Sequence, residues 1–464
     1  MRLLDGNTTA QPSRGGPLVI ALVLCTVQFV DVLGVTVVVT ALPSMLADLS
    51  ATTGQGTLAV TAYAACFGGL LMFASRLGDR VGHRQTVLLA MGVFAVASLL
   101  GAFAPSVWAL TIARALQGVA AAASVPSALR LLTTLIPAGA ARRRAVAGWS
   151  AAGAAAGAAG FVVGGGLSEL ASWRAVFWMN ILIAAVLVFL IFRVIPADTR
   201  AERAVTIPWV PAGLLTMGAM SLVAGPTVFA EGGQGILGII LVLIGAASGV
   251  GFWISDRRAL VPLVPRPAWR SINLRWGTFG SFANTATTSS TITVATLYLQ
   301  QERGLSPMEA AGTLVSFSLL VIAGSTTASW LISAIGWRRS LGLGLSVIAA
   351  GNVTMTAWPG TIGIAIAAGL CGLGIGVSSV AATDMGTHVQ EPVKASAAGA
   401  INTAAQLGTA IGTAIILLIA ITINPQYAWA TSAVCALIGA IAVGRKADSA
   451  PKEHHSPAGH SPSH

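Results

Sequence analysis

Two ionisable side chains lie inside long apolar stretches of this 464-residue chain, and they are its strongest candidates for chemistry. Asp31 lies midway along the apolar run 17–42, and Arg114 lies about one turn inside the run 108–132. A carboxylate in hydrocarbon is costly unless it is protonated, paired or facing water, and an arginine keeps its charge. We interpret Asp31 as a binding site for a proton or a cation. Arg114 could pair with it if their helices adjoin.

A permanently satisfied structural role is the alternative for both residues. Backbone carbonyls and hydroxyl groups of neighbouring helices could hold Asp31, and carbonyls could fix Arg114 as a packing element. The sequence alone does not bring the two residues together.

The composition places these residues in a membrane protein. The chain is 55% hydrophobic and only 9% charged, whereas soluble domains carry about a quarter charged residues. The net charge of +11 does not indicate nucleic-acid binding, because the basic residues lie in short loops and are not interleaved with aromatic residues. All four cysteines lie within apolar runs, which makes them buried hydrophobic residues rather than metal or disulfide partners.

Runs of about 20 apolar residues, the length that crosses a bilayer, recur along the whole chain. They predict an all-α polytopic protein with about fourteen transmembrane helices, at residues 17–42, 56–73, 87–104, 108–132, 145–167, 175–195, 208–230, 236–254, 276–299, 310–334, 340–358, 362–383, 395–423 and 427–443. Arginine and lysine are concentrated in alternate loops and both tails, while the opposite loops hold only Arg174 and Arg303. This asymmetry predicts a cell inner-membrane protein with both termini in the cytoplasm.

The charged loop 75–86, SRLGDRVGHRQT, joins the second and third predicted helices. It contains Asp79, Arg80 and Arg84, and Gly82 allows a tight turn with positive φ. The loop 333–341, SAIGWRRSL, is similar, with Gly336 in the place of Gly82. Such repetition is typical of transporters built from two related halves.

The predicted domains follow from this repeat. They are a cytoplasmic tail at 1–16, a six-helix half at 17–196, a two-helix linker region at 197–270, a second six-helix half at 271–445, and a disordered cytoplasmic tail at 446–464.

Two further stretches have an unusual composition. The ninth apolar run is rich in hydroxyl groups, and we interpret one face of it as lining a wet cavity, together with a polar face of the thirteenth run; the candidates are Asn284, Thr285, Thr288, Asn402 and Gln406. Hydroxyls that merely bond to their own helix are the alternative. The fifth run carries small residues on several faces, which indicates close helix packing; its glycines are Gly153, Gly157, Gly160, Gly164 and Gly165.

Familiar catalytic and nucleotide-binding motifs are missing from the sequence. GxxxxGK[ST], HExxH, GxSxG and CxxC do not occur. We therefore expect no enzymatic activity, no resident cofactor and no metal site.

Several of these motifs resemble the major facilitator superfamily, in its fourteen-helix drug:proton antiporter branch. The loop 75–86 is similar to the family's motif between helices two and three, LTIARALQG to its fourth-helix motif, and the glycines at 160, 164 and 165 to its antiporter motif. The resemblance implies two pseudo-symmetric six-helix halves around two extra helices. It also implies that Arg114 takes part in proton coupling and that Asp79, Arg80, Gly82 and Arg84 form a conformational latch.

The expected function is proton-coupled export of hydrophobic or cationic small molecules by a monomer in the lipid bilayer, driven by the proton gradient. A dedicated exporter of one endogenous metabolite or antibiotic is the nearest alternative, and a non-transporting receptor or scaffold is a more distant one. Charges held inside the membrane argue against a scaffold, which does not need them.

Overall fold

A computed structural model describes residues 16–198, 208–230 and 235–444 of the chain. Within these ranges the ordered elements are all helical, and fourteen of them have 20 or more residues. The elements are α1 (Pro17–Asp48), α2 (Thr53–Val81), α3 (His83–Ala102), α4 (Val107–Leu135), α5 (Ala140–Leu170), α6 (Arg174–Val194), α7 (Trp209–Ala230), α8 (Gly235–Arg258), α9 (Arg266–Arg270), α10 (Ile272–Leu297), the π-helical turn η1 (Tyr298–Glu302), α11 (Pro307–Ile335), α12 (Trp337–Ala357), α13 (Thr361–Thr387), α14 (Glu391–Thr422) and α15 (Pro425–Gly444).

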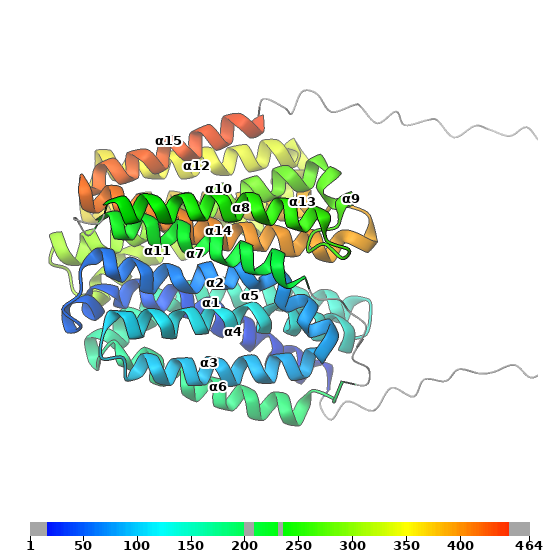
Figure 1. Cartoon of the computed structure of the whole chain (residues 1–464). Coiled ribbons are helices and arrows are strands. Elements are labelled where there is room, and N and C mark those ends of the chain that lie inside the picture. The colour runs from blue at the N-terminus through cyan, green and yellow to red at the C-terminus, as the bar shows by residue number, and fades with distance from the viewer. Residues whose placement is uncertain (1–15, 199–207, 231–234, 445–464) are drawn as a thin grey trace, which may run out of the picture.

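The long helices lie side by side in one bundle (Figure 1). In the first half, α1 packs against α5 and α6, α2 against α4, and α3 against α4 and α6. The second half has the corresponding contacts, with α10 against α14 and α15, α11 against α13, and α12 against α13 and α15. The α7–α8 pair packs through α7 against both α2 and α14, so it covers one side of the boundary between the halves.

The repeat suggested by the two loops extends into the helix packing. Gly82 and Gly336 each separate two helices with a positive φ, 108° and 84°, as their glycine type predicts. A Cβ on Gly118 of α4 would strike the backbone of Tyr63 on α2, and a Cβ on Gly372 of α13 would strike the backbone of Phe317 on α11. Tyr63 is as many residues before Phe317, and Gly118 as many before Gly372, as Gly82 is before Gly336.

Thirteen of the fourteen long helices are long and apolar enough to cross a membrane, among the residues that the structure describes. The remaining one is α10, which contains the hydroxyl-rich stretch predicted as the ninth span. Its 26 residues would span about 39 Å at 1.5 Å each, so α10 is long enough to cross a membrane. Its polarity is what separates it from the thirteen apolar helices. It tolerates that polarity because α13, α14 and α15 surround it.

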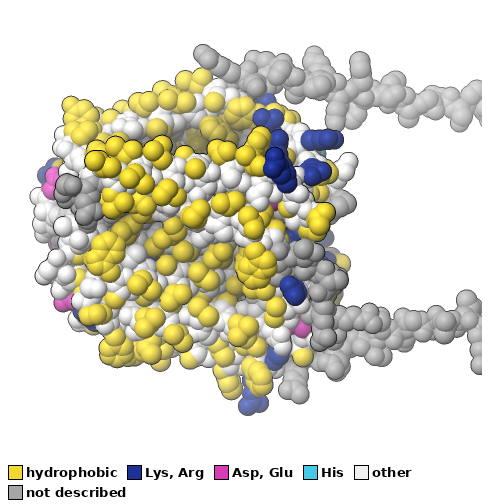
Figure 2. Space-filling view, in the orientation of Figure 1, with side chains coloured by type: hydrophobic (Ala, Val, Ile, Leu, Met, Phe, Trp, Pro, Cys, Tyr) yellow, Lys and Arg dark blue, Asp and Glu magenta, His cyan; other side chains and the backbone are white. Residues whose placement is uncertain are grey.

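The surface has the charge pattern of a membrane protein. Figure 2 shows a broad apolar belt over the middle of the bundle, with Lys and Arg side chains gathered mainly at the end that carries α9. The exposed large residues of the belt include Leu182, Val186 and Phe189 on α6 and Leu243 on α8. Lipid-facing helices require such a surface.

The two halves touch at the end of the bundle opposite α9. Gln300 Nε2 donates to the Thr40 carbonyl at 3.0 Å, and the Met308 backbone N–H donates to a Glu169 carboxylate oxygen at 3.0 Å. Phe161 and Phe317 pack edge to face at 6.2 Å between centroids. The halves are therefore joined through α1, α5, η1 and α11 at the end opposite α9. Toward the basic end, α5 from Ala140 to Ala155 has many exposed positions, while Met72 of α2 still packs with Ala397 and Ala400 of α14.

Candidate functional site

Asp31 lies in the middle of α1 and is 1% exposed. Ser124 on α4 donates its hydroxyl to Asp31 Oδ2 at 2.8 Å, and Tyr63 on α2 donates to the Asp31 backbone carbonyl at 2.9 Å. Asp31 Oδ1 is also buried and has no hydrogen-bond partner among the residues that the structure describes. The carboxyl group therefore has one satisfied oxygen and one free acceptor in a site enclosed by three helices.

Arg114 on α4 is completely buried and is held by neutral groups. Its Nη1 donates to Gln117 Oε1 at 2.8 Å, and Gln117 Nε2 donates to the Ser98 hydroxyl on α3 at 2.9 Å. Its guanidinium also lies over the Tyr63 ring, 4.5 Å from the centroid. Cation–π contact and amide oxygens stabilise a cation without neutralising it, so the charge of Arg114 stays uncompensated.

Asp31 and Arg114 lie in adjoining helices but form no ion pair with each other. Tyr63 lies between them, with its hydroxyl on the Asp31 carbonyl and its ring against Arg114. The pairing that the sequence left open is thus replaced by an indirect contact through one tyrosine. Protonation of Asp31 would change the field at Arg114 without breaking a salt bridge.

The glycines of α5 allow two close helix contacts. Cβ atoms on Gly160 and Gly164 would collide with Thr36 and Thr40 of α1, and one on Gly165 would collide with Pro307 of α11. Of the other two predicted glycines, Gly153 faces Gln28, and Gly157 has open space beside it while its carbonyl accepts from Ser318. The helix therefore links α1 to the second half.

The polar groups of α10 mostly hydrogen-bond inside the protein. Asn284 and Thr288 are fully buried, with Asn284 Nδ2 donating to Ser378 and Ser379 at 3.1 Å and Thr288 donating to the Asn284 carbonyl at 2.6 Å. Thr285 is half-buried and donates to the Ala405 carbonyl on α14 at 2.7 Å. The contacts of Asn284 and Thr285 hold α10 to α13 and α14, whereas Thr288 bonds within α10 itself. Their role in lining a cavity stays a prediction.

The predicted polar face of α14 is half-buried at Asn402 and Gln406. A Cβ added to Gly68 of α2 would lie only 2.8 Å from the Cβ of Gln406. Gln406 is thus placed at the contact of α2 with α14, on the boundary between the halves.

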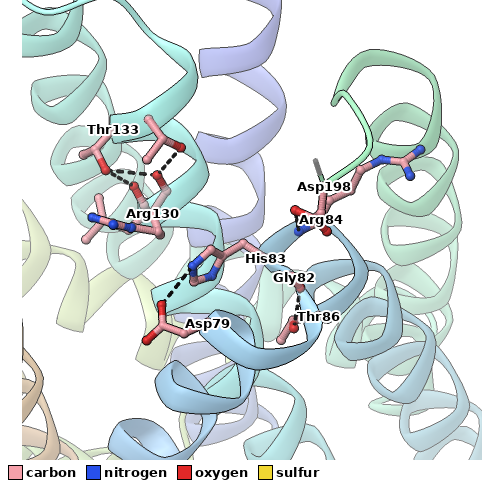
Figure 3. A network of polar contacts seen from close by, with 10 residues as sticks. Asp79, Gly82, His83, Arg84, Thr86, Arg130, Thr133 and Asp198 are labelled. Carbon is pink, nitrogen blue, oxygen red and sulfur yellow. Dashed lines mark hydrogen bonds and ion pairs between the residues drawn. The ribbon is translucent and has the colours of Figure 1, made fainter. Parts of the chain in front are cut away.

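The charged stretch 75–86, predicted as a loop, is helical except at Gly82, because α2 continues to Val81 and α3 begins at His83. The residues around this one-residue turn form a local network (Figure 3). Asp79 pairs with His83 Nε2 at 3.2 Å, one turn further along. The Asp198 carboxylate, just after α6, accepts the backbone N–H groups of Arg84 and Gln85 at 3.2 Å each. Asp198 thereby caps the start of α3, where a negative charge is favoured by the helix dipole.

Arg80 and Arg84, the two arginines predicted to belong to the latch, differ in their side-chain contacts. Arg84 donates through Nη2 to the Phe192 carbonyl at 2.9 Å, which ties α3 to α6. Arg80 is exposed at the last turn of α2.

Four residues of these networks were missed by the sequence reasoning: Tyr63, Ser98, Ser124 and Asp198. For Tyr63, Ser98 and Ser124 the available signal was a single polar residue in an otherwise apolar helix, which is common for hydroxyls that bond to their own backbone. Asp198 follows α6 and had no such signal. Their importance depends on which helices adjoin, and composition does not contain that information.

These features define a polytopic membrane transporter of small molecules, built from two related six-helix halves with buried charges in the first half. The chain belongs to the Major Facilitator Superfamily, whose family model matches residues 24–265 and 277–463.

Among its relatives is the tetracenomycin C resistance and export protein of Streptomyces glaucescens, which is 32% identical over 88% of this chain and 77% of that protein. The multidrug efflux pump LfrA of Mycolicibacterium smegmatis is 28% identical over 88% of this chain and 81% of that protein. The fold is similar to a crystal structure of the peptide transporter POT in complex with sulfate, with a TM-score of 0.73, 14% identity, and coverage of 92% of this chain and 94% of that one.

Proposed function

We propose that the protein exports apolar or cationic small molecules across the cytoplasmic membrane in exchange for protons, with Asp31 as the proton-binding group. The observation that carries the proposal is the Asp31 carboxyl, which is 1% exposed and has one oxygen without a partner among the described residues. A buried carboxyl beside an uncompensated arginine has two states, protonated and charged, that differ strongly in their interaction with the surroundings. Such a group can couple proton binding to conformation.

The α5 surface on the side of α11 favours a broad substrate class. Ala154, Gly157 and Ala158 lie on the same side of the helix as Phe161, which packs against Phe317 of α11, and they offer shape and apolar contact but no side-chain hydrogen bonds. A site of this kind discriminates poorly between apolar molecules. One named relative is a multidrug efflux pump, which supports this broad class. The other is named for resistance to and export of a single antibiotic, so a dedicated exporter is the second candidate function.

The orientation and assembly also belong to this proposal. We propose that the α9 end and both termini face the cytoplasm; the concentration of basic residues at the α9 end supports this orientation under the positive-inside rule. In this orientation the exposed first part of α5 faces the cytoplasmic side. The glycine contacts of α5 are used inside the chain, on α1 and α11, which supports a monomer.

The loop between α2 and α3 would act as the latch of the alternating conformations. In the described conformation Asp79 is paired only within its own turn, with His83. We propose that Asp79 exchanges this local partner for a group of the second half when the halves draw closer at the basic end.

Dye uptake into inverted membrane vesicles tests the proposed function. With an acidic interior and no ATP, wild-type vesicles are expected to accumulate several unrelated dyes, and Asp31→Asn vesicles are expected to show only background uptake. Asp384→Asn is the matched control, because this exposed carboxylate contacts Trp337 at the surface and should leave uptake unchanged. Wild-type uptake by Asp31→Asn would overturn the role of Asp31, and uptake of a single compound would favour the dedicated exporter.

A further inference from the structure

A groove with a volume of 780 Å³ lies along α1 and α5 at the basic end of the bundle. Its walls are apolar and include Leu18, Leu22 and Phe29 of α1 and Ala141, Gly148 and Ala155 of α5. Arg144 is the one charged residue among those that line it. The groove therefore combines a long apolar trough with a single cation.

The groove opens to the outside of the bundle rather than to the space between the halves. On α5, Phe161 faces α11, and at 100° per residue Gly148 lies about 140° away from Phe161 around the helix axis, with Arg144 between these two directions. Leu18 is 72% exposed, which is typical of a surface that contacts lipid. A membrane component can thus reach the groove from the bilayer directly.

The charges near the mouth have one sign. Arg143 and Arg144 are both exposed and lie in the first turns of α5. A second groove, of 680 Å³ between α7 and α8, has the same arrangement, with apolar walls that include Trp209 and Ile254 and with Arg258 as its one charged lining residue. Two separate grooves of this composition at one end indicate a common type of ligand.

We propose that the α1–α5 groove binds an anionic phospholipid, with an acyl chain along Leu18, Leu22 and Phe29 and the phosphate group at Arg144. Arginine forms charge-assisted, often bidentate hydrogen bonds with phosphate oxygens, and anionic lipids concentrate in the leaflet that faces basic protein segments. A zwitterionic lipid would fill the same trough but would lack the net charge that Arg143 and Arg144 attract. The assignment is independent of proton coupling and of the exported substrate.

Native mass spectrometry of the purified full-length protein tests this site, with phosphatidylglycerol and phosphatidylcholine as probes. The wild type is expected to retain phosphatidylglycerol in preference to phosphatidylcholine, and Arg144→Gln is expected to bind phosphatidylglycerol about fivefold more weakly. Arg339→Gln is the matched control, because it removes an exposed charge from the second half, outside both grooves. Binding that Arg144→Gln leaves unchanged, or equal retention of the two lipids, would overturn the proposal.

A second variant separates the trough from the charge. Gly148→Phe fills the groove beside Cys25, whose sulfur lies 3.7 Å from the position of a Cβ on Gly148, and should abolish the bound lipid while all arginines remain. Retained phosphatidylglycerol in this variant, or displacement of the lipid by millimolar inorganic phosphate alone, would contradict an acyl-chain site.

Discussion

The two six-helix halves use the same packing but hold different polar groups at matching positions. In the first half, Ser98 on α3 bonds to Gln117 on α4, and Gln117 bonds to Arg114. The interval from Gly82 to Gly336 also leads from Ser98 to Asn352 on α12 and from Gln117 to Cys371 on α13. Asn352 and Cys371 contact each other at 3.8 Å. The position that corresponds to Arg114 is occupied by alanine, at residue 368.

The same interval relates Asp31 of α1 to Thr285 of α10. Asp31 keeps a free carboxyl oxygen, whereas the Thr285 hydroxyl is used in a hydrogen bond to α14. The second half shows that the fold can be built at these positions without charged groups. This difference supports our proposal that Asp31 and Arg114 serve transport, since buried charges seldom stabilise a protein.

The largest effect is expected from removal of the buried cation. Arg114→Met should lower gradient-driven transport about 100-fold. The stability of the protein should change little, because an apolar residue of similar length often replaces a buried charge at no cost. Transport in vesicles and thermal unfolding of the purified protein measure the two effects.

Arg303→Met is the control for that variant, because Arg303 contacts Tyr298 in a similar way but lies exposed at the end opposite α9. It should transport as the wild type does. Normal transport by Arg114→Met would remove the functional difference between the halves.

The glycine contacts should be equally sensitive in both halves. Gly118→Ala and Gly372→Ala each place a Cβ against the backbone of the partner helix, and each should destabilise the protein by about 2–3 kcal/mol. Gly312→Ala, with open space around the added Cβ, should be neutral or stabilising by up to about 1 kcal/mol. Thermal unfolding in detergent measures all three, and sensitivity in one half alone would show that the packing is not shared.

The two turns should differ slightly in their tolerance of a side chain. Gly82→Ala and Gly336→Ala both introduce strain of about 1–2 kcal/mol at a positive φ. The cost should be larger at Gly82, because its Cβ would meet the Asp198 carboxylate that caps α3, whereas Gly336 has open space. Unfolding temperatures of the two variants provide the test, and a larger loss at Gly336 would contradict it.

The smallest effect concerns the hydrogen bond to the carboxyl group. Ser124→Ala removes the donor to Asp31 Oδ2 and should slow transport about tenfold. Ser378→Ala, at the matching position, leaves Asn284 bonded to Ser379 and should have little effect. Equal rates for the two variants would indicate that Ser124 does not tune Asp31.

The sequence predicted the architecture well because its signals are local. Fourteen apolar runs, the two glycine turns and the buried positions of Asp31 and Arg114 all follow from residue type and spacing. The composition of α10 was informative in a different way, since its hydroxyls distinguish a helix surrounded by protein from one that faces lipid.

The contacts within the site could not be predicted in this way. Whether Arg114 meets Asp31 depends on the rotation of α1 and α4 about their axes and on the Tyr63 side chain from a third helix. Asp198 reaches α3 from beyond the end of α6, more than a hundred residues along the chain. Helices that are apolar on every face do not encode such rotations in their residue pattern.

Exchange of substrate for a proton bound at Asp31 requires that this proton leave when substrate binds, and proton release from the purified protein tests the exchange most directly. A permanently charged dye that the wild type transports would be added to the protein in weakly buffered detergent, with a pH indicator as the readout. The wild type and Asp384→Asn should release about one proton per protein, and Asp31→Asn should release none. Equal release from Asp31→Asn would contradict the assignment of the coupling site to α1.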